Sequence, residues 1–263
     1  MTDARSPELG HSSGPYETCP TPSIPFALTS LGQLEPFVDA YFSLFHQSYP
    51  IVHEATFRAQ FMEVIPRPHG NAWQVLLFVL AAVGAMMAST QSSDVDLALF
   101  EAAKVRLSIE MIETGNMSLV QALTLTSNYL QKRNKPNSGY NYMALARRIA
   151  MGLGFHKEFP SWETNVFNKE SRRRIWYCLY IFDVGGIITF SRPLDFPEKG
   201  VDVELPMNVR DSVGICLIST IIARLTFFFS ESHDGNEANP TADQRDDYLH
   251  PPEGAGNISH GDE

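Results

Sequence analysis

The sequence predicts an all-α fold, a bundle of packed antiparallel helical hairpins with disordered termini. Apolar residues recur at three- and four-residue steps in one segment after another, which is the period of an amphipathic helix. No stretch shows strand alternation sustained over several elements. The chain has 263 residues, of which 44% are hydrophobic and 19% charged, so it can bury a sizeable core. Together these observations favour helices packed on helices.

Composition divides the chain into three parts. Residues 1–30 are rich in Pro, Ser, Thr and Gly, and we expect this N-terminal segment to be disordered. Residues 31–229 carry the helical pattern and hold 18 acidic and 18 basic residues. Residues 230–263 hold nine acids against one arginine, which predicts an acidic disordered tail. The net charge of −10 therefore lies in the termini, and the neutral helical part lacks the basic surface that binds nucleic acid.

The first predicted helices lie between residues 34 and 88. From 34 to 49, one helical face gathers the apolar side chains Phe37, Val38, Tyr41, Phe42 and Phe45, and Pro50 ends the segment. A short amphipathic helix follows through Phe61 to Ile65. Residues 71–88 are apolar on nearly all sides, which predicts a central helix. The apolar runs at 73–88 and 213–229 are both shorter than the roughly 20 residues that cross a bilayer, so no membrane segment is expected.

The middle of the chain predicts three further helices. We expect residues 96–113 to form one helix, with Leu97, Phe100, Val105 and Ile109 on its inner side. Ser118 is a suitable N-cap for the next helix, whose inner face would be Leu119, Ala122, Leu123, Thr126 and Leu130. Residues 135–139 predict a turn. Residues 140–153 predict a helix that ends at Gly154.

The most aromatic helix is expected from residue 170, with Asn168 as its N-cap. Its helical steps place Ile175, Trp176, Leu179, Phe182 and Asp183 together, and the density of aromatic side chains predicts a helix packed on most sides. Pro193 biases Arg192 toward an extended conformation, so the helix should end before that residue. Arg172, Arg173 and Arg174 spread around the helix axis and predict a solvated helix start with local ion pairs.

Asp183 is a carboxylate set inside this aromatic helix. Such a group must be paired, protonated or exposed on one edge. We expect it to pair with an arginine, either Arg192 or an arginine of a neighbouring helix. Trp176, Asp183, Arg192 and Pro193 are therefore the candidate structural or regulatory residues of the chain.

Short motifs in a fixed order resemble a known family. An arginine-rich helix start is followed by Ile-Trp-Tyr, Leu-Tyr-x-x-Asp, Arg-Pro and Val-Asp-Val-x-Leu-Pro within residues 170–206. Residues 49–57 (Tyr-Pro-x-x-His-x-x-x-Phe), 118–123 and 144–156 add further matches. Over roughly residues 34–206 the chain resembles the fungal-specific transcription factor domain, which is the regulatory middle region of fungal zinc-cluster transcription factors.

The resemblance implies a role in nuclear regulation of DNA-templated transcription. It further implies protein partners in the transcription machinery or self-association, and a possible small-molecule effector. The alternative is a stand-alone helical module that binds proteins or small molecules without any contact to DNA. The expected nuclear localisation of the chain is implied by the family resemblance alone.

The cysteines differ from the pattern of the resembled family. The family's DNA-binding module is a six-cysteine cluster that holds two zinc ions, whereas this chain has only Cys19, Cys178 and Cys216 and no C-x2-C pair. We therefore expect no cofactor in this chain and no direct DNA binding by the chain alone. We also expect a regulatory domain that is shortened at its C-terminus. A natural short form, a fragment and an imperfect gene model all fit these departures.

No motif predicts an enzyme. The serines lack a strand–turn–helix nucleophile elbow, and neither a phosphate-binding glycine loop nor an HExxH motif is present. His46 and His53 form a conceivable metal pair, but a helix-end imidazole and a loop imidazole are the simpler interpretation. His156 is expected to bond backbone carbonyls. We therefore predict neither catalytic nor metal-binding residues.

Overall fold

The computed structural model describes residues 31–89, 94–158, 165–193 and 200–207. These residues are mostly helical, and within them the only β-type pairing is an isolated parallel bridge between Lys157 and Asp202. The all-α prediction is confirmed. The expectations for residues 1–30 and for the acidic tail at 230–263 concern parts of the chain outside the described ranges.

The helices follow one another with short connections. In chain order they are α1 (Glu35–Ala40), α2 (Glu54–Phe61), α3 (Ala72–Ala88), α4 (Val95–Arg106), α5 (Ile109–Thr114), α6 (Met117–Lys132), α7 (Pro136–Gly152) and α8 (Val166–Thr189). A 3-10 turn (Leu31–Leu34) precedes α1, and a π-helical turn (Tyr41–Phe45) follows it.

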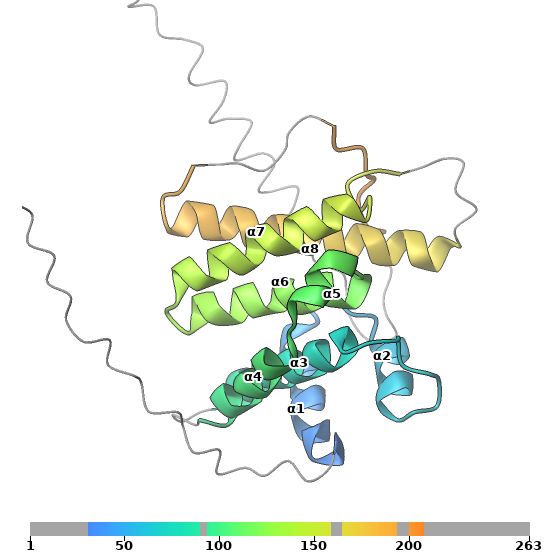
Figure 1. The fold of residues 1–263 in the computed structure, drawn as a ribbon, viewed down its shortest axis with the longest axis vertical. Coiled ribbons are helices and arrows are strands. Elements are labelled where there is room, and N and C mark those ends of the chain that lie inside the picture. The colour runs from blue at the N-terminus through green and yellow to red at the C-terminus, as the bar shows by residue number, and fades with distance from the viewer. Residues whose placement is uncertain (1–30, 90–93, 159–164, 194–199, 208–263) are drawn as a thin grey trace, which may run out of the picture.

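Helix α3 lies at the centre of the first half of the fold, packed against α1, α4 and α6 (Figure 1). Its side chains are buried on nearly all sides from Trp73 to Ala85, with Gln74 facing solvent. Gly84 sits where α1 crosses, and a Cβ there would lie 2.9 Å from the carbonyl carbon of Phe37 and closer still to its oxygen. The absence of a side chain at this glycine therefore sets how closely the two helices approach.

The first apolar face is carried by a helix that changes its winding. After α1, the Tyr41 carbonyl accepts a hydrogen bond from His46 N at 3.0 Å, which is an i→i+5 step and defines the π-turn. Tyr41, Phe42 and Phe45 are all buried as a result. The predicted inner face of residues 34–49 is thus confirmed, and the wide turn adds His46 to it.

Helices α6, α7 and α8 form the second half, where α7 packs on α6 and both contact α8 (Figure 1). Two glycines allow these contacts. A Cβ on Gly139 of α7 would lie 2.9 Å from the Ser127 carbonyl oxygen, and one on Gly186 of α8 would lie 2.9 Å from the side-chain amide of Gln131. The Gly185-Gly186 pair in the core helix therefore includes one glycine with a packing role, since Gly185 faces open space.

The prediction of a single helix over residues 96–113 is wrong. Leu107 and Ser108 adopt extended conformations and separate α4 from α5. The predicted inner face is also wrong in part, because Val105 and Ile109 are 84% and 72% exposed, although Phe100 is buried as expected. The buried residues of α4 are Asp96, Leu99, Phe100 and Ala103.

The inward orientation of Asp96 is explained by its hydrogen-bond partners on and beside α6. Its carboxylate accepts hydrogen bonds from the Tyr129 hydroxyl and from Arg133 Nε, both at 2.7 Å. Burial, followed by the hydrogen bond to Asp96, raises the pKa of Tyr129 well above its ordinary range. A buried carboxylate with two donors is satisfied, and this network joins α4 to the end of α6.

Helix starts differ from the sequence-based predictions by a few residues. Asn116, not Ser118, caps α6 by accepting a hydrogen bond from Leu119 N at 2.9 Å. Asn165, not Asn168, caps α8, and Asn168 N donates to it. The predicted turn at 135–139 is the first turn of α7, which begins at Pro136. Proline suits that first position because its missing N–H has no partner in a helix start anyway.

Candidate functional site

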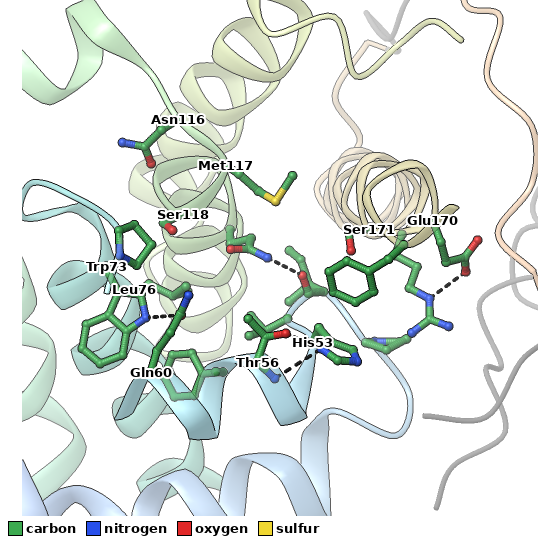
Figure 2. Close-up of a pocket in the computed structure, with 18 of the residues that line it drawn as sticks. His53, Thr56, Gln60, Trp73, Leu76, Asn116, Met117, Ser118, Glu170 and Ser171 are labelled. Atoms are coloured by element: carbon green, nitrogen blue, oxygen red, sulfur yellow. Dashed lines mark hydrogen bonds and ion pairs between the residues drawn. The ribbon is translucent and has the colours of Figure 1, made fainter. Parts of the chain in front are cut away.

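A cavity of about 700 Å³ opens between the starts of several helices (Figure 2). Its walls come from α2, from the N-terminal parts of α3, α6 and α8, from the loop residues that precede α2 and α3, and from Met207. Figure 2 shows Met117 and Ser118 of α6 on one side and Glu170 and Ser171 of α8 on the other. The size lies within the range of small-molecule sites in proteins.

Apolar side chains supply much of the lining. They are Pro50, Ile51, Val52, Phe57, Pro68, Trp73, Leu76, Met117, Val166, Phe167 and Met207. The deeper ones belong to the core, whereas Val166, Phe167 and Met207 are 68%, 45% and 40% exposed and form an apolar rim. The Trp73 ring is packed by protein groups, since Phe57 stacks on it with ring centroids 5.5 Å apart and the Arg67 guanidinium lies 4.7 Å from its centroid.

Three amide side chains of the lining are each held by one of their two polar atoms. Gln60 Oε1 accepts a hydrogen bond from the indole nitrogen of Trp73 at 2.8 Å. Gln121 Nε2 donates to the Ile51 carbonyl at 2.8 Å, and Asn116 Oδ1 caps α6. An indole or backbone N–H can only donate and a carbonyl can only accept, so each amide orientation is fixed.

His53 is the N-cap of α2 and also lines the cavity. Its Nδ1 accepts a hydrogen bond from Thr56 N at 3.3 Å and lies 2.7 Å from the Thr56 hydroxyl oxygen. The ring packs edge-on against Phe167 with centroids 4.6 Å apart. An Nδ1 that accepts a backbone N–H leaves the ring proton on Nε2. The interpretation of His53 as a loop imidazole is therefore replaced by a capping role at the cavity.

One ion pair lies in the wall formed by α8. Arg174 Nε donates to Glu170 Oε1 at 2.7 Å, and both side chains are more than nine-tenths buried. Glu170 Oε2 also accepts a hydrogen bond from Met207 N at 3.1 Å, which ties the segment after α8 to the cavity edge. Contrary to the expected solvated helix start, the last residue of the arginine triplet is buried.

The other two arginines of the triplet hold the connections around α8. Arg172 donates to the Leu153 carbonyl at 2.8 Å. Arg173 forms ion pairs with Glu158 and Glu204, which joins the segment before α8 to the segment after it. The Arg173 guanidinium lowers the pKa of Glu158 below its usual value. A predicted local ion pair is found between Arg174 and Glu170, whereas Arg173 pairs with residues outside α8.

His156 lies beside this connection and packs against Trp176 with ring centroids 6.1 Å apart. Burial, with a smaller contribution from the charge of Lys157, lowers the pKa of its imidazole. The prediction that its ring bonds backbone carbonyls is wrong for Nδ1, which has no hydrogen-bond partner among the described residues. The backbone of His156 instead accepts a hydrogen bond from Asp202 N.

The sequence-predicted candidates lie in the core of α8 and just beyond it, away from the cavity lining. Trp176 is only 1% exposed. Asp183 is paired with Arg147 of α7, whose Nη1 lies 2.8 Å from Asp183 Oδ2. The expected internal pairing of Asp183 is therefore found with an arginine of the neighbouring helix and not with Arg192.

Arg192 and Pro193 follow the end of α8 at Thr189, as expected from the proline. The Arg192 guanidinium donates to Asn137 Oδ1 at 2.7 Å and lies over the Tyr140 ring, 4.2 Å from its centroid. It therefore anchors the end of α8 on the start of α7. Pro193 is exposed.

The cavity residues were missed because they come from segments far apart in the sequence. Gln60 and Gln121 occupy ordinary helical positions, and no spacing rule connects them with the start of α8. In the described ranges no group of three or more His, Cys, Asp or Glu side chains is placed to hold a metal ion. The helices seen in the structure include none that is long and apolar enough to span a membrane.

Comparison with known proteins gives a family match over most of the helical region. Residues 38–213 match the model of the fungal specific transcription factor domain. This interval includes all the helices from the π-turn to α8 and every residue of the cavity. No solved structure matches the chain significantly.

Curated relatives carry the same region. The lactose regulatory protein LAC9 of Kluyveromyces lactis is 30% identical over 190 residues, which is 72% of this chain and 22% of that protein. Transcription factor FBD3 of Gibberella moniliformis is 28% identical over 73% of this chain and 26% of its own length. The acetamidase regulatory protein of Emericella nidulans is 31% identical over 68% of this chain and 23% of its own length. The chain thus spans about a quarter of the length of these relatives.

Proposed function

This chain belongs to the family of the fungal specific transcription factor domain, and from that premise we propose that it regulates DNA-templated transcription in the nucleus. The observation that carries the proposal is the family match over residues 38–213. The names of the relatives, which describe regulatory proteins and transcription factors, support it. The chain corresponds to their regulatory domain, and nuclear localisation follows from this role.

Action through partners is part of the proposal. The helical part of the chain carries equal numbers of acidic and basic residues, which gives it no charge excess to attract the phosphate backbone. We therefore propose that the chain does not bind DNA by itself and acts through proteins of the transcription machinery or through self-association. Neither zinc nor another cofactor is proposed for this chain, nor is catalytic activity.

A reporter assay tests the regulatory role. The 263-residue chain is fused to a heterologous DNA-binding domain and expressed in a fungal host with a reporter gene. We expect reporter output to differ from that of the DNA-binding domain alone. A fusion that carries Gly84→Leu, which cannot preserve the contact of α3 with α1, should return output to the baseline. Unchanged output from a fusion that is present in the nucleus at equal level would contradict the proposal.

A second candidate function is favoured by the cavity. A stand-alone module that binds a small molecule, without contact to DNA, needs a pre-formed site, and the space between α2, α6 and α8 has the size for one. The two roles are compatible, since a regulatory domain can respond to an effector bound in this cavity. The two roles are tested separately: direct binding measurements test the small-molecule site, and the reporter assay tests transcription alone.

A further inference from the structure

We propose that the cavity binds an amphipathic organic anion: a small molecule with a carboxylate or similar acidic group on an apolar body. The inference rests on the small-molecule role proposed above and adds the chemical class of the ligand. It is derived from three features of the cavity wall. These are the direction of its hydrogen-bonding groups, its helix starts and its balance of charge.

The unused polar atoms of the wall are mostly donors. With its oxygen bound to Trp73, Gln60 offers its amide nitrogen, and Asn116 likewise offers Nδ2 because its oxygen caps α6. His53 offers Nε2–H because its Nδ1 is the acceptor at the start of α2. Within the described part of the chain, none of these three donors has a partner of its own. Such a wall favours a ligand whose polar end consists of acceptor oxygens.

Two hydroxyl groups of the wall can donate or accept, and one amide oxygen can accept. The hydroxyl groups of Ser118 and Ser171 lie on opposite walls (Figure 2) and have no hydrogen-bond partner among the described residues. Gln121, which is only 8% exposed, keeps its Oε1 as an acceptor after its nitrogen has bonded to Ile51. This oxygen can accept a hydrogen bond from a ligand that also carries one donor.

Helix starts add a favourable potential for negative charge. The caps or first residues of α2, α6 and α8 line the cavity, as does Trp73 in the first turn of α3. The N-terminal end of each helix carries a partial positive charge from its unpaired N–H groups. Four such ends around one space favour an anion there.

Fixed charges in the wall do not oppose this potential. Glu170 is the acidic residue of the lining, and its carboxylate is already paired with Arg174 and bonded to Met207 N. The pair is close to neutral as a unit. Glu54, in the first turn of α2, is paired with Arg58 at 2.8 Å. The partial positive charges of the helix starts therefore determine the sign of the electrostatic potential in the cavity.

The rest of the cavity fits an apolar body. Ile51, Phe57 and Leu76 are nearly inaccessible to solvent and supply the deep wall, while Phe167 and Met207 line its exposed rim. Removal of apolar ligand surface from water is favourable in proportion to its area. The site therefore combines a donor-rich region with an apolar one, which is the arrangement that an amphipathic acid requires.

Two matched fluorescent probes test the inference on the purified 263-residue chain. One is 8-anilinonaphthalene-1-sulfonate, an aromatic anion, and the other is N-phenyl-1-naphthylamine, which has the same rings without the sulfonate. We expect saturable binding of the sulfonate about tenfold tighter than that of the neutral amine. Equal affinity, or tighter binding of the neutral amine, would overturn the proposal.

Variants locate the binding. Ser118→Phe fills the cavity and should abolish saturable binding of both probes, whereas Ser138→Phe on the exposed side of α7 should leave it unchanged. Glu170→Gln keeps the shape of the wall and removes its negative charge. It should tighten the sulfonate several-fold and leave the neutral amine as it was.

The controls separate this inference from the transcriptional role. Circular dichroism verifies that Ser118→Phe retains its helical content. If this variant does not fold, Glu170→Gln still tests the proposal, because it should change the affinity for the sulfonate and not the affinity for the neutral amine. Sulfonate binding that survives in a folded Ser118→Phe variant would place the probe elsewhere and overturn the proposal. Because binding is measured on the isolated chain, loss of the anion preference does not affect the reporter result, and the converse also holds.

Discussion

The backbone of Gly84 in α3 lies directly against the Phe37 carbonyl of α1, so closely that no side chain fits between the two helices. We predict that Gly84→Ala destabilises the fold by more than about 3 kcal/mol, because the neighbouring atoms belong to backbone and cannot move as a side chain would. The free energy of unfolding is measured by chemical denaturation.

Gly185 is the matched control for this substitution. It is also an interior helical glycine, but a Cβ there meets nothing within 4 Å. Gly185→Ala should be neutral or stabilise the protein by up to about 1 kcal/mol through helix propensity. A cost for Gly84→Ala no larger than that for Gly185→Ala would contradict the close approach of α1 and α3.

The buried pair of Arg147 and Asp183 should be sensitive to the loss of one partner. We expect Arg147→Met to cost about 3–5 kcal/mol, since it leaves the Asp183 carboxylate buried without this cation. The double variant Arg147→Met, Asp183→Leu should recover much of that stability, because two apolar residues replace two charges. Arg192→Gln, at a more exposed arginine, should cost less than about 1 kcal/mol. A double variant as unstable as the single one would refute this account.

Trp176 is a test of how α8 is buried. Truncation to alanine removes a large side chain that is 1% exposed, and we predict a cost of about 3–5 kcal/mol in the free energy of unfolding. Phe190 lies just beyond the end of α8 and is 37% exposed, so Phe190→Ala should cost much less. Denaturation of the two variants side by side checks the difference. A loss under about 1 kcal/mol for Trp176→Ala would mean that the tryptophan is not in the core.

His156 should make stability depend on pH in the mildly acidic range. Its pKa in the folded protein is lowered from 6.5, so the unfolded chain takes up a proton at higher pH than the folded one does. Full stability is therefore present above 6.5 and decreases as the pH falls through 6.5 toward the folded pKa. His156→Gln should flatten this part of the stability profile. A slope that His156→Gln leaves unchanged would exclude this residue as the source.

Glu158 acts in a lower pH range. Arg173 lowers its folded pKa from 4.5, so the stabilisation is present above 4.5 and is lost as the pH falls through the folded pKa. The two effects are separable because their ranges differ.

Metal and DNA binding test the expected dependence on partners. We predict that the purified 263-residue chain contains no stoichiometric zinc and binds duplex DNA no better than a neutral protein does. The reasons are its three scattered cysteines and the neutral charge of residues 31–229. Metal analysis and a mobility-shift titration provide the measurements. Stoichiometric zinc, or salt-sensitive binding at submicromolar concentration, would overturn the prediction.

Local periodicity was enough to identify most of the helices and many of their buried faces. The steps of three and four residues place Tyr41, Phe42 and Phe45 together, and the uninterrupted apolar run of α3 can be satisfied only at the centre of a bundle. The family resemblance rested on short motifs in order, and the match over residues 38–213 confirms it. These features depend on neighbours along the chain, and for that reason they are visible without a structure.

Caps, breaks and partners depended on tertiary contacts. Several residues near each helix start are able to cap it, and packing selected Asn116 and Asn165. Asp96 points inward because Tyr129 and Arg133, more than thirty residues away in the sequence, donate hydrogen bonds to its carboxylate. The cavity follows the same rule. Its walls combine residues of α2, α3, α6 and α8 with the loop residues before α2 and α3 and with Met207, and no pattern within a single segment encodes that meeting.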